Sequence, residues 1–162
     1  MPVTVLSRKR HPGIRAVAVR AEARALLEAL DERAADLTVV LVDDDAIREL
    51  NRRYRGKDRP TDVLAFAARE GPRAPGDEGI LGDVVISLET ASVQAGRHRH
   101  APAAEVRHLL IHGTLHLLGY DHEKSASEAR RMRSKERELA RLFEGDGKPV
   151  RPSRRKRTGK GS

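Results

Sequence analysis

The segment from His112 to His122 constrains the fold of this chain more than any other part of its sequence. It reads His-Gly-Thr-Leu-His-Leu-Leu-Gly-Tyr-Asp-His. Its first two histidines are four residues apart, a spacing that places both side chains on one face of a helix. Gly119 is the residue type that most readily takes the left-handed conformation that ends a helix. The segment therefore predicts a helix that ends near Gly119, with His122 on the turn beyond it.

Three histidines in this arrangement predict a metal site. The chain has no cysteine, so any metal must be held by His, Asp or Glu. His112 and His116 share a helical face, and the turn brings His122 back toward them. Three imidazole nitrogens at about 2.0–2.1 Å, with water in the fourth position, are typical of a catalytic rather than a structural zinc site. We expect one Zn²⁺ per chain, although nickel or copper also suits imidazole ligands.

The same spacing matches the zinc-protease pattern H-E-x-x-H-x-x-G-x-x-H at each ligand and at the glycine. The match fails where the pattern has its general-base glutamate, because this chain has Gly113 there. The expected site is therefore a Lewis-acid pocket used for a reaction other than peptide hydrolysis. His108 lies one turn before His112, and we expect it to be a packed helical residue rather than support for a metal ligand.

The pattern of apolar residues predicts an α+β fold, a small sheet of three to four strands packed with several helices. The metal site then lies at the end of a central helix. Asp43 is a helix N-cap and Gly56 ends that helix, whereas residues 70–79 read as a loop. Inward-facing residues of the last helix are expected to be Met132, Leu139 and Leu142. The expected strands cover residues 3–6, 37–42, 63–66 and 81–88, and the other helices cover 17–30, 90–100, 102–118 and 124–143.

Charge separates the chain into two parts. Residues 145–162 hold seven Lys or Arg and one Asp, and so carry +6 of the formal net charge of +8. This segment is rich in Gly, Pro and Ser and has almost no apolar side chain, which predicts disorder. We therefore expect a single catalytic domain over residues 1–144 and a disordered basic tail over 145–162. The tail is either a phosphate-binding arm or a solubilising segment.

Other global features point to a cytoplasmic protein that does not enter a membrane. The first ten residues lack the layout of a signal peptide, and no apolar run approaches the roughly 18 residues that span a bilayer. The chain has two Tyr, two Phe and no Trp. Since aromatic rings are the usual stacking platforms for single-stranded nucleic acid, RNA binding is expected to depend mainly on charge and a catalytic pocket.

A second motif lies over residues 51–66 and reads Asn-Arg-Arg-Tyr-Arg-Gly-Lys-Asp-Arg-Pro-Thr-Asp-Val-Leu-Ala-Phe. By itself it predicts a helix, a basic turn and a strand. Together with the histidine segment and with Leu-Gly-Asp-Val-Val-Ile-Ser at residues 81–87, it resembles the YbeY family of metal-dependent bacterial endoribonucleases of rRNA maturation. The resemblance spans residues 37–143, and the histidine segment that ends in Gly-Tyr-Asp-His is its most specific part.

That resemblance implies a mixed four-stranded sheet, zinc bound by His112, His116 and His122, and Arg55 as the functional arginine. It also implies single-stranded RNA as substrate, in particular the 3′ end of small-subunit rRNA, with a role in ribosome quality control and the ribosome as partner. Two segments depart from the family pattern. Residues 65–67 read Ala-Phe-Ala where the family often has Ser-Phe-Pro, and residues 123–128 are less acidic than usual.

Several alternatives remain open at the level of sequence. The general base is not identified, since Asp121 and Asp62 are first expected to shape a turn and the entry to a strand. The attacking group is either water or the ribose 2′-hydroxyl. A ribosome- or RNA-binding assembly factor with a structural metal, and another zinc hydrolase, are the alternative functions, and Gly113 argues against a peptidase. The oligomeric state is open.

Overall fold

The structure, a computed structural model, describes residues 3–68 and 79–144. Its strands are short and rich in Val, Leu and Ile, residues that fit a pleated, buried surface. They form one sheet in the order β1-β2-β4-β3, in which β1, β2 and β4 run parallel and β3 is antiparallel to β4. The sheet is therefore mixed, as expected. The strands are β1 (Val3–Ser7), β2 (Asp36–Val42), β3 (Val63–Ala67) and β4 (Ile80–Ser87).

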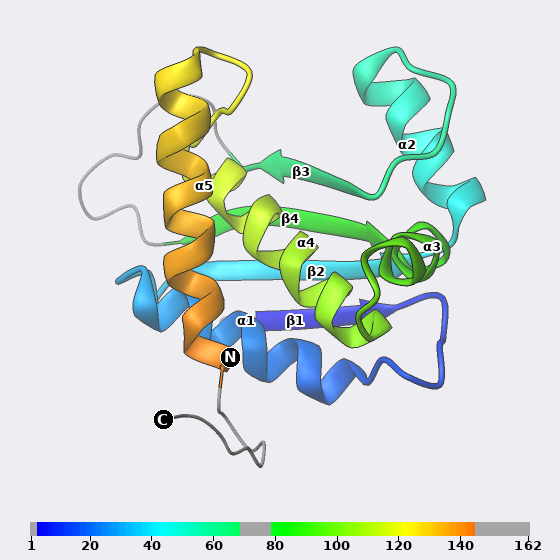
Figure 1. Ribbon diagram of the computed structural model, residues 1–162. Helices are drawn as coiled ribbons and strands as arrows, with labels where there is room; N and C mark the ends of the chain where they lie inside the picture. Colours follow the sequence, from blue (N-terminus) through cyan, green and yellow to red (C-terminus); the bar gives the residue numbers. More distant parts are fainter. Residues whose placement is uncertain (1–2, 69–78, 145–162) are drawn as a thin grey trace.

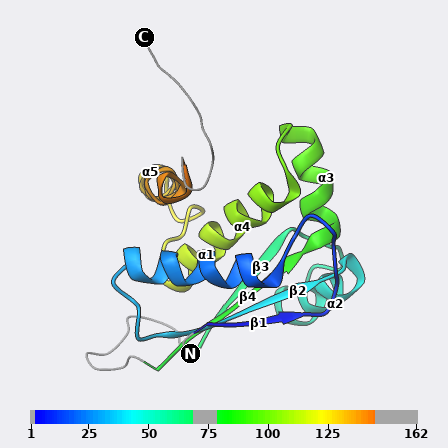
Figure 2. The ribbon, with the colours of Figure 1, turned by 90° about the horizontal axis from the view of Figure 1, so that it is seen from below.

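Helices cover one face of this sheet in two layers (Figure 1, Figure 2). Helix α4 lies across the middle of the sheet beside α1, and α5 packs on α4 on the side away from the strands. The main core lies between the sheet and α1 and α4, and it includes Leu26, Leu37, Val84 and Leu110, each fully buried. The helices are α1 (Ala16–Ala29), α2 (Asp44–Arg55), α3 (Leu88–His98), α4 (Pro102–Leu117) and α5 (Ala126–Ala140), followed by a 3₁₀ turn (Arg141–Phe143).

Helix α2 packs on the other face of the sheet, near the end where α3 begins (Figure 1). Ile47 of α2 lies in a small separate core with Val42, Leu64 and Val85. The Asp43 side chain accepts a hydrogen bond from the Ala46 amide and caps the helix, as the acidic sequence predicts. In Figure 1, α2 and the turn between α4 and α5 both rise beyond the free edge of β3. This edge of the sheet is where the candidate site lies.

Most expected elements are confirmed within one to three residues at each end, and three details differ. Helix α3 begins at Leu88, two residues early, because the Ser87 side chain accepts from the Thr90 amide and caps the helix there. Leu142 is 43% exposed, so the expectation that it faces inward is wrong, whereas Met132 and Leu139 are buried. His108 is also exposed, so it is not the packed residue that we expected.

Two expectations fall outside the described residues. The loop predicted over residues 70–79 is described only at Gly79, and the predicted tail at 145–162 is not described. None of the described helices combines the length and the apolar character needed to cross a lipid bilayer.

Candidate metal centre

The end of α4 places the third histidine beside the first two. Gly119 has a positive φ of 97°, the Gly119 amide bonds to the His116 carbonyl, and the Tyr120 amide bonds to the Leu115 carbonyl. This pair of bonds is the Schellman arrangement that ends a helix at a left-handed residue. The chain therefore reverses where the sequence predicts, and His122 lies next to the last turn of the helix.

The three imidazoles form one compact group. The Nε2 atoms of His112 and His116 are 3.2 Å apart, and a ring nitrogen of each histidine lies within 4.8 Å of those of the other two. The ring centroid of His122 is 5.3 Å from each of the other two centroids. Two nitrogens bound to one tetrahedral zinc at 2.0–2.1 Å would be about 3.3 Å apart, close to the observed separation. The group could therefore hold a metal ion.

His116 is half-buried. Burial lowers the pKa of its imidazole, and the neighbouring His112 and His122 lower it further. Nearby carboxylates of Asp121 and Glu123 act in the opposite direction but do not outweigh burial. A neutral imidazole is the form that binds metals, so the electrostatics of the site agree with the ligand role.

A carboxylate from α5 supports the group from behind. Glu136 Oε2 lies 2.6 Å from Nδ1 of His112, and both side chains are largely shielded from water. A proton on Nδ1 that is shared with a carboxylate leaves the Nε2 lone pair toward His116, which is the arrangement of many metal-bound histidines. Burial raises the pKa of the Glu136 carboxyl, but the hydrogen bond from His112 and the charges of the neighbouring histidines together outweigh burial and keep that pKa below its ordinary value.

Sequence reasoning missed Glu136, although the sequence holds a signal for it. Glu136 is four residues after Met132 and three before Leu139, and both of those residues are buried. It therefore lies on the apolar stripe of α5, where a carboxylate needs a polar partner. The α5 helix begins at a cap in which Ser125 accepts from the Glu128 amide at 3.0 Å.

Gly113 faces the sheet rather than the imidazoles. A Cβ atom at this position would lie 2.7 Å from Val84 Cγ1 and 3.3 Å from Val63 Cγ2. Contacts this short leave no room for a glutamate side chain in the present helix position. The structure therefore explains the departure from the protease pattern, because the residue after His112 is used for close packing of α4 on the sheet.

Arg55 ends α2 and reaches the edge strand. Its guanidinium donates to the Ala65 carbonyl at 2.7 Å, and its Cζ lies 5.2 Å from the centroid of the Phe66 ring. Ala65 pairs with Val84, the residue that packs on Gly113. Strand β3 therefore contacts both Arg55 and helix α4, which carries His112 and His116.

The segment after α2 is held by its own hydrogen bonds. Gly56 adopts a left-handed conformation at the helix end, as predicted, and the Asn51 side chain donates to the Arg59 carbonyl at 2.9 Å. Arg48 and Asp58 form an ion pair at 2.8 Å across the same turn. These contacts fix the direction in which α2 ends, and so orient Arg55.

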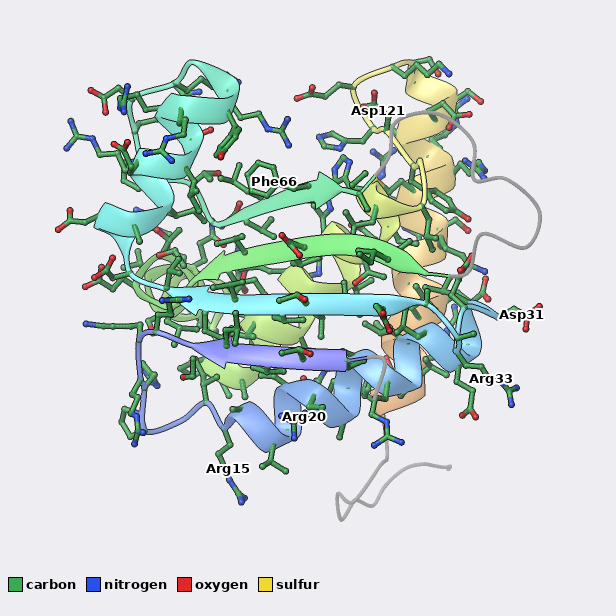
Figure 3. All side chains as sticks on the ribbon, turned by 180° about the vertical axis from the view of Figure 1, so that it is seen from behind. Arg15, Arg20, Asp31, Arg33, Phe66 and Asp121 are labelled. Atoms are coloured by element: carbon green, nitrogen blue, oxygen red, sulfur yellow. The ribbon has the colours of Figure 1, made fainter. Side chains whose placement is uncertain are left out.

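Asp62 and Asp121 have the structural roles that we expected first. Asp62 accepts from the Val63 amide at 2.7 Å at the start of β3, and it also accepts from Gln94. Asp121 accepts from the Glu123 amide at 3.0 Å within the turn that carries His122. Figure 3 shows Phe66 on β3 and Asp121 on this turn, both on the β3 side of the molecule.

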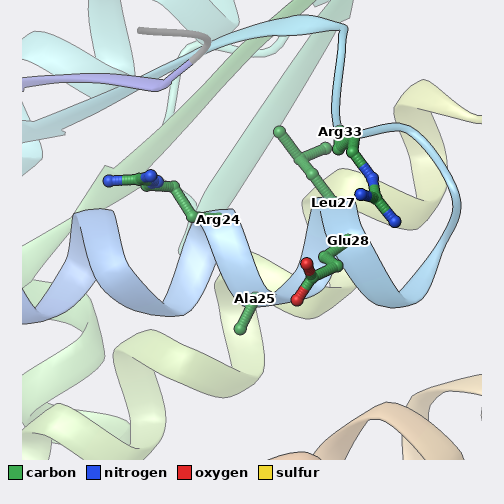
Figure 4. A pocket seen from close by; sticks show the side chains of 5 residues that line it. All are labelled: Arg24, Ala25, Leu27, Glu28 and Arg33. Atoms are coloured by element: carbon green, nitrogen blue, oxygen red, sulfur yellow. The ribbon is translucent and has the colours of Figure 1, made fainter.

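A surface hollow of about 390 Å³ is bordered by α1 and the segment after it, and its lining has no histidine and one carboxylate (Figure 4). Another hollow, of about 180 Å³, adjoins the three-His group because His112 lines it. Its lining is mainly polar and consists of Asp62, Gln94, His98, Glu105, His108, Leu109 and His112.

Comparison with known proteins agrees with the resemblance seen in the sequence. Residues 7–144 match the family described as Endoribonuclease YbeY. The Endoribonuclease YbeY of Geobacter sulfurreducens is 46% identical over 149 residues, which cover 91% of this chain and 99% of that protein. The Endoribonuclease YbeY of Anaeromyxobacter sp. is 50% identical over 141 residues, 86% of this chain and 71% of that protein.

A solved structure supports the same relationship. The solution structure of TM1509 from Thermotoga maritima has a TM-score of 0.58 and 25% sequence identity, and the match covers 91% of this chain and 99% of that one. The family match includes the three-His group, Glu136, Gly113 and Arg55, all of which lie within residues 7–144. The chain belongs to the Endoribonuclease YbeY family, and it is by that membership an RNA-cleaving hydrolase.

Proposed function

We propose that this chain is a zinc-dependent endoribonuclease that cuts single-stranded RNA in the cytoplasm. Its proposed substrate is the 3′ end of small-subunit rRNA, and its proposed role includes ribosome quality control, with the ribosome as partner. Family membership supports RNA cleavage. The observation that carries the metal dependence is the convergence of three imidazoles, backed by the Glu136 carboxylate, on one point at the end of α4.

His112, His116 and His122 are the residues that would hold the zinc ion. Bound zinc supplies Lewis-acid polarisation of a phosphoryl oxygen and activation of water. Glu136 keeps the His112 ring in the orientation and tautomer that this binding needs. His122 is exposed whereas the other two rings are half-buried, so the group opens to solvent on the His122 side. An RNA phosphate has access from that side.

Arg55 is the proposed phosphate-binding residue. One amino group of its guanidinium is held by the Ala65 carbonyl, and the guanidinium lies near the Phe66 ring. A guanidinium has five N–H donors, so the others remain available to a phosphate. Because the side chain is already oriented, its charge acts on the transition state without a cost of reorganisation. Loss of such a donor typically lowers the rate by about 10²–10³.

An exposed aromatic ring beside Arg55 favours single-stranded RNA. Tyr54 is 57% exposed and packs edge-on against Phe66, with ring centroids 5.4 Å apart. An unpaired base can stack on such a ring, whereas a base inside a duplex cannot. The low aromatic content of the chain predicted that binding depends mainly on charge and a catalytic pocket. Two of its four aromatic residues nevertheless lie next to the proposed phosphate-binding arginine.

The test is cleavage of a single-stranded RNA from the small-subunit rRNA 3′ end, with variants purified side by side. We expect internal cuts by the unaltered chain, none by His116→Ala, and a rate about 10²–10³ lower for Arg55→Ala. Arg53→Ala is the matched control, because Arg53 is exposed on the same helix and pairs with Glu49. A 2′,3′-cyclic phosphate on the product identifies the ribose 2′-hydroxyl as the attacking group, and a linear phosphate favours water.

The outcomes separate this proposal from its alternatives. Equal cleavage by the unaltered chain and His116→Ala would mean that the metal centre is not the nuclease site. Binding without cleavage, together with full activity in ribosome assembly after Arg55→Ala, would favour a binding factor with a structural metal. Cleavage of a peptide library would favour another zinc hydrolase, against the steric evidence at Gly113.

A further inference from the structure

A second group of metal-binding side chains lies where α3 is followed by α4. His98 is the last residue of α3, His100 lies in the connection, and Glu105 is in the first turn of α4. Nδ1 of His98 is 3.1 Å from Oε1 of Glu105, and Nε2 of His100 is 2.5 Å from the same oxygen. All three potential ligand atoms lie within 4.8 Å of one another.

The backbone between the two histidines turns both rings toward this carboxylate. Arg99 has a φ of 60°, in the left-handed region, and it is one of two described residues other than glycine with a positive φ. The His100 amide then bonds to the Ala95 carbonyl at 3.1 Å. An L-residue in this conformation costs about 1–2 kcal/mol, so the surrounding contacts must hold the reversal in place. Its consequence is that residues two apart in sequence contact one oxygen atom.

The carboxylate itself is unusually placed. The side chain of Glu105 is 1% exposed. Among the described residues, its carboxylate forms hydrogen bonds with the two imidazoles. A buried carboxylate is expected to be paired with a cation or to coordinate a metal.

We propose that His98, His100 and Glu105 form a second site for a divalent transition-metal ion such as zinc, separate from the three-His centre. Two imidazole nitrogens and one carboxylate oxygen are an established ligand set for zinc. The three atoms that now share hydrogen bonds are the same three that would bind the ion. His98 and His100 are 57% and 38% exposed, so an ion can reach the site from solvent.

The neighbouring cavity provides space and a link to the first centre. The cavity of about 180 Å³ is lined by His98 and Glu105 of the proposed site and also by His112 of the three-His group. Because one water occupies about 30 Å³ of liquid volume, the cavity has room for several waters to complete a coordination shell. An ion at the second site would add positive charge to a cavity that adjoins the first centre. The proposal itself does not depend on RNA cleavage.

The experiment measures zinc bound to the full chain in which the first centre has been removed by the double substitution His112→Ala and His116→Ala. We expect this variant to retain one zinc ion per chain in equilibrium dialysis, and zinc to raise its Tm. Adding His98→Ala is expected to lower the residual affinity by more than about tenfold, since even the loss of an outer partner of a ligand typically costs 10–100-fold. His108→Ala is the matched control, because His108 is an exposed histidine on the same cavity.

Two results would overturn the proposal. The first is absence of bound zinc in the double variant at free zinc concentrations that fill the centre of the unaltered chain. The second is residual zinc that persists after both His98 and His100 are replaced, or that is lost with His108→Ala. Replacement of Glu105 could unfold the chain because that side chain is buried, so the decisive variants are the exposed histidines. Bound zinc is the readout, so the result stands whether or not the chain cleaves RNA.

Discussion

Replacement of Glu136 is expected to weaken zinc binding at the three-His centre while leaving the fold intact. Its carboxylate lies 2.6 Å from Nδ1 of His112. This contact holds the ring from the side opposite to the His116 contact at Nε2. Loss of a carboxylate behind a metal-bound histidine typically lowers metal affinity by about 10–100-fold, which corresponds to about 1.4–2.8 kcal/mol. Glu136→Ala removes both charge and acceptor and should give the full effect. Glu136→Gln keeps an acceptor and should give a smaller loss.

The assay is competition for zinc with a chelator of known affinity at neutral pH. Glu138→Gln is the matched control, because Glu138 is 62% exposed on the same helix and bonds to Lys135 at 3.1 Å. Thermal unfolding without zinc separates binding from stability. The His112 side chain is 26% exposed, so water can replace the lost acceptor, and we expect the zinc-free variant to lose less than about 1.5 kcal/mol.

Two results would refute this reasoning. If Glu136→Ala binds zinc as tightly as Glu138→Gln, the carboxylate does not position His112 for a metal. Glu136→Ala could instead lower the free energy of unfolding of the zinc-free chain by as much as it weakens the free energy of zinc binding. In that case Glu136 is a packing residue between α4 and α5.

Three further predictions test the packing and the RNA-binding surface. Gly113→Ala should lower the Tm, because overpacking against Val84 costs about 1–3 kcal/mol, which exceeds the helix-propensity gain of about 1 kcal/mol. Gly96→Ala is the control and should raise the Tm, because its new methyl group meets no atom within 4 Å. Equal effects of the two substitutions on the Tm would contradict the close contact between Gly113 and Val84. Burial raises the pKa of the Asp83 carboxyl, so the folded state binds the carboxyl proton more tightly than the unfolded state does. The free energy of unfolding therefore falls as the pH rises through the range in which this carboxyl group loses its proton. Asp83→Asn should therefore stabilise the chain at neutral pH and have no such effect in acid below about pH 3, which urea unfolding at both pH values measures. Tyr54→Ala should weaken binding of single-stranded RNA by about fivefold to 150-fold, from a stacking energy of about 1–3 kcal/mol, whereas Tyr54→Phe should not. The affinity is measured by fluorescence anisotropy, and an unchanged affinity for Tyr54→Ala would exclude stacking.

Features that depend on neighbouring residues were predictable from the sequence. The cap at Asp43, the left-handed helix ends at Gly56 and Gly119, and the convergence of the three histidines all follow from residues within one or two turns of each other. Such signals act through local hydrogen bonds and backbone preferences, which the sequence displays directly. This is why the sequence predicts the three-His group but not its surroundings.

Features that depend on packing between elements were not predictable in the same way. Glu136 is 24 residues from His112, and their contact requires the particular way in which α5 lies on α4. The bond from Arg55 to Ala65 requires the end of α2 to meet an edge strand. The exposure of His108 and Leu142 was also wrongly predicted, because helical periodicity shows which residues share a face but not how far a neighbouring element extends over it.

His112 and Gly113 together connect the chemistry of the site to its packing. Adjacent residues on a helix point in different directions, so His112 can face its metal-binding partners while Gly113 faces Val84 and Val63. A larger residue at 113 would push α4 away from β3 and β4, and with it the three-His group. Arg55 is fixed to β3 through Ala65 and would not follow that movement. The small residue after the first histidine therefore does more than omit a peptidase base, since it sets the separation between the three-His group and the proposed phosphate-binding arginine.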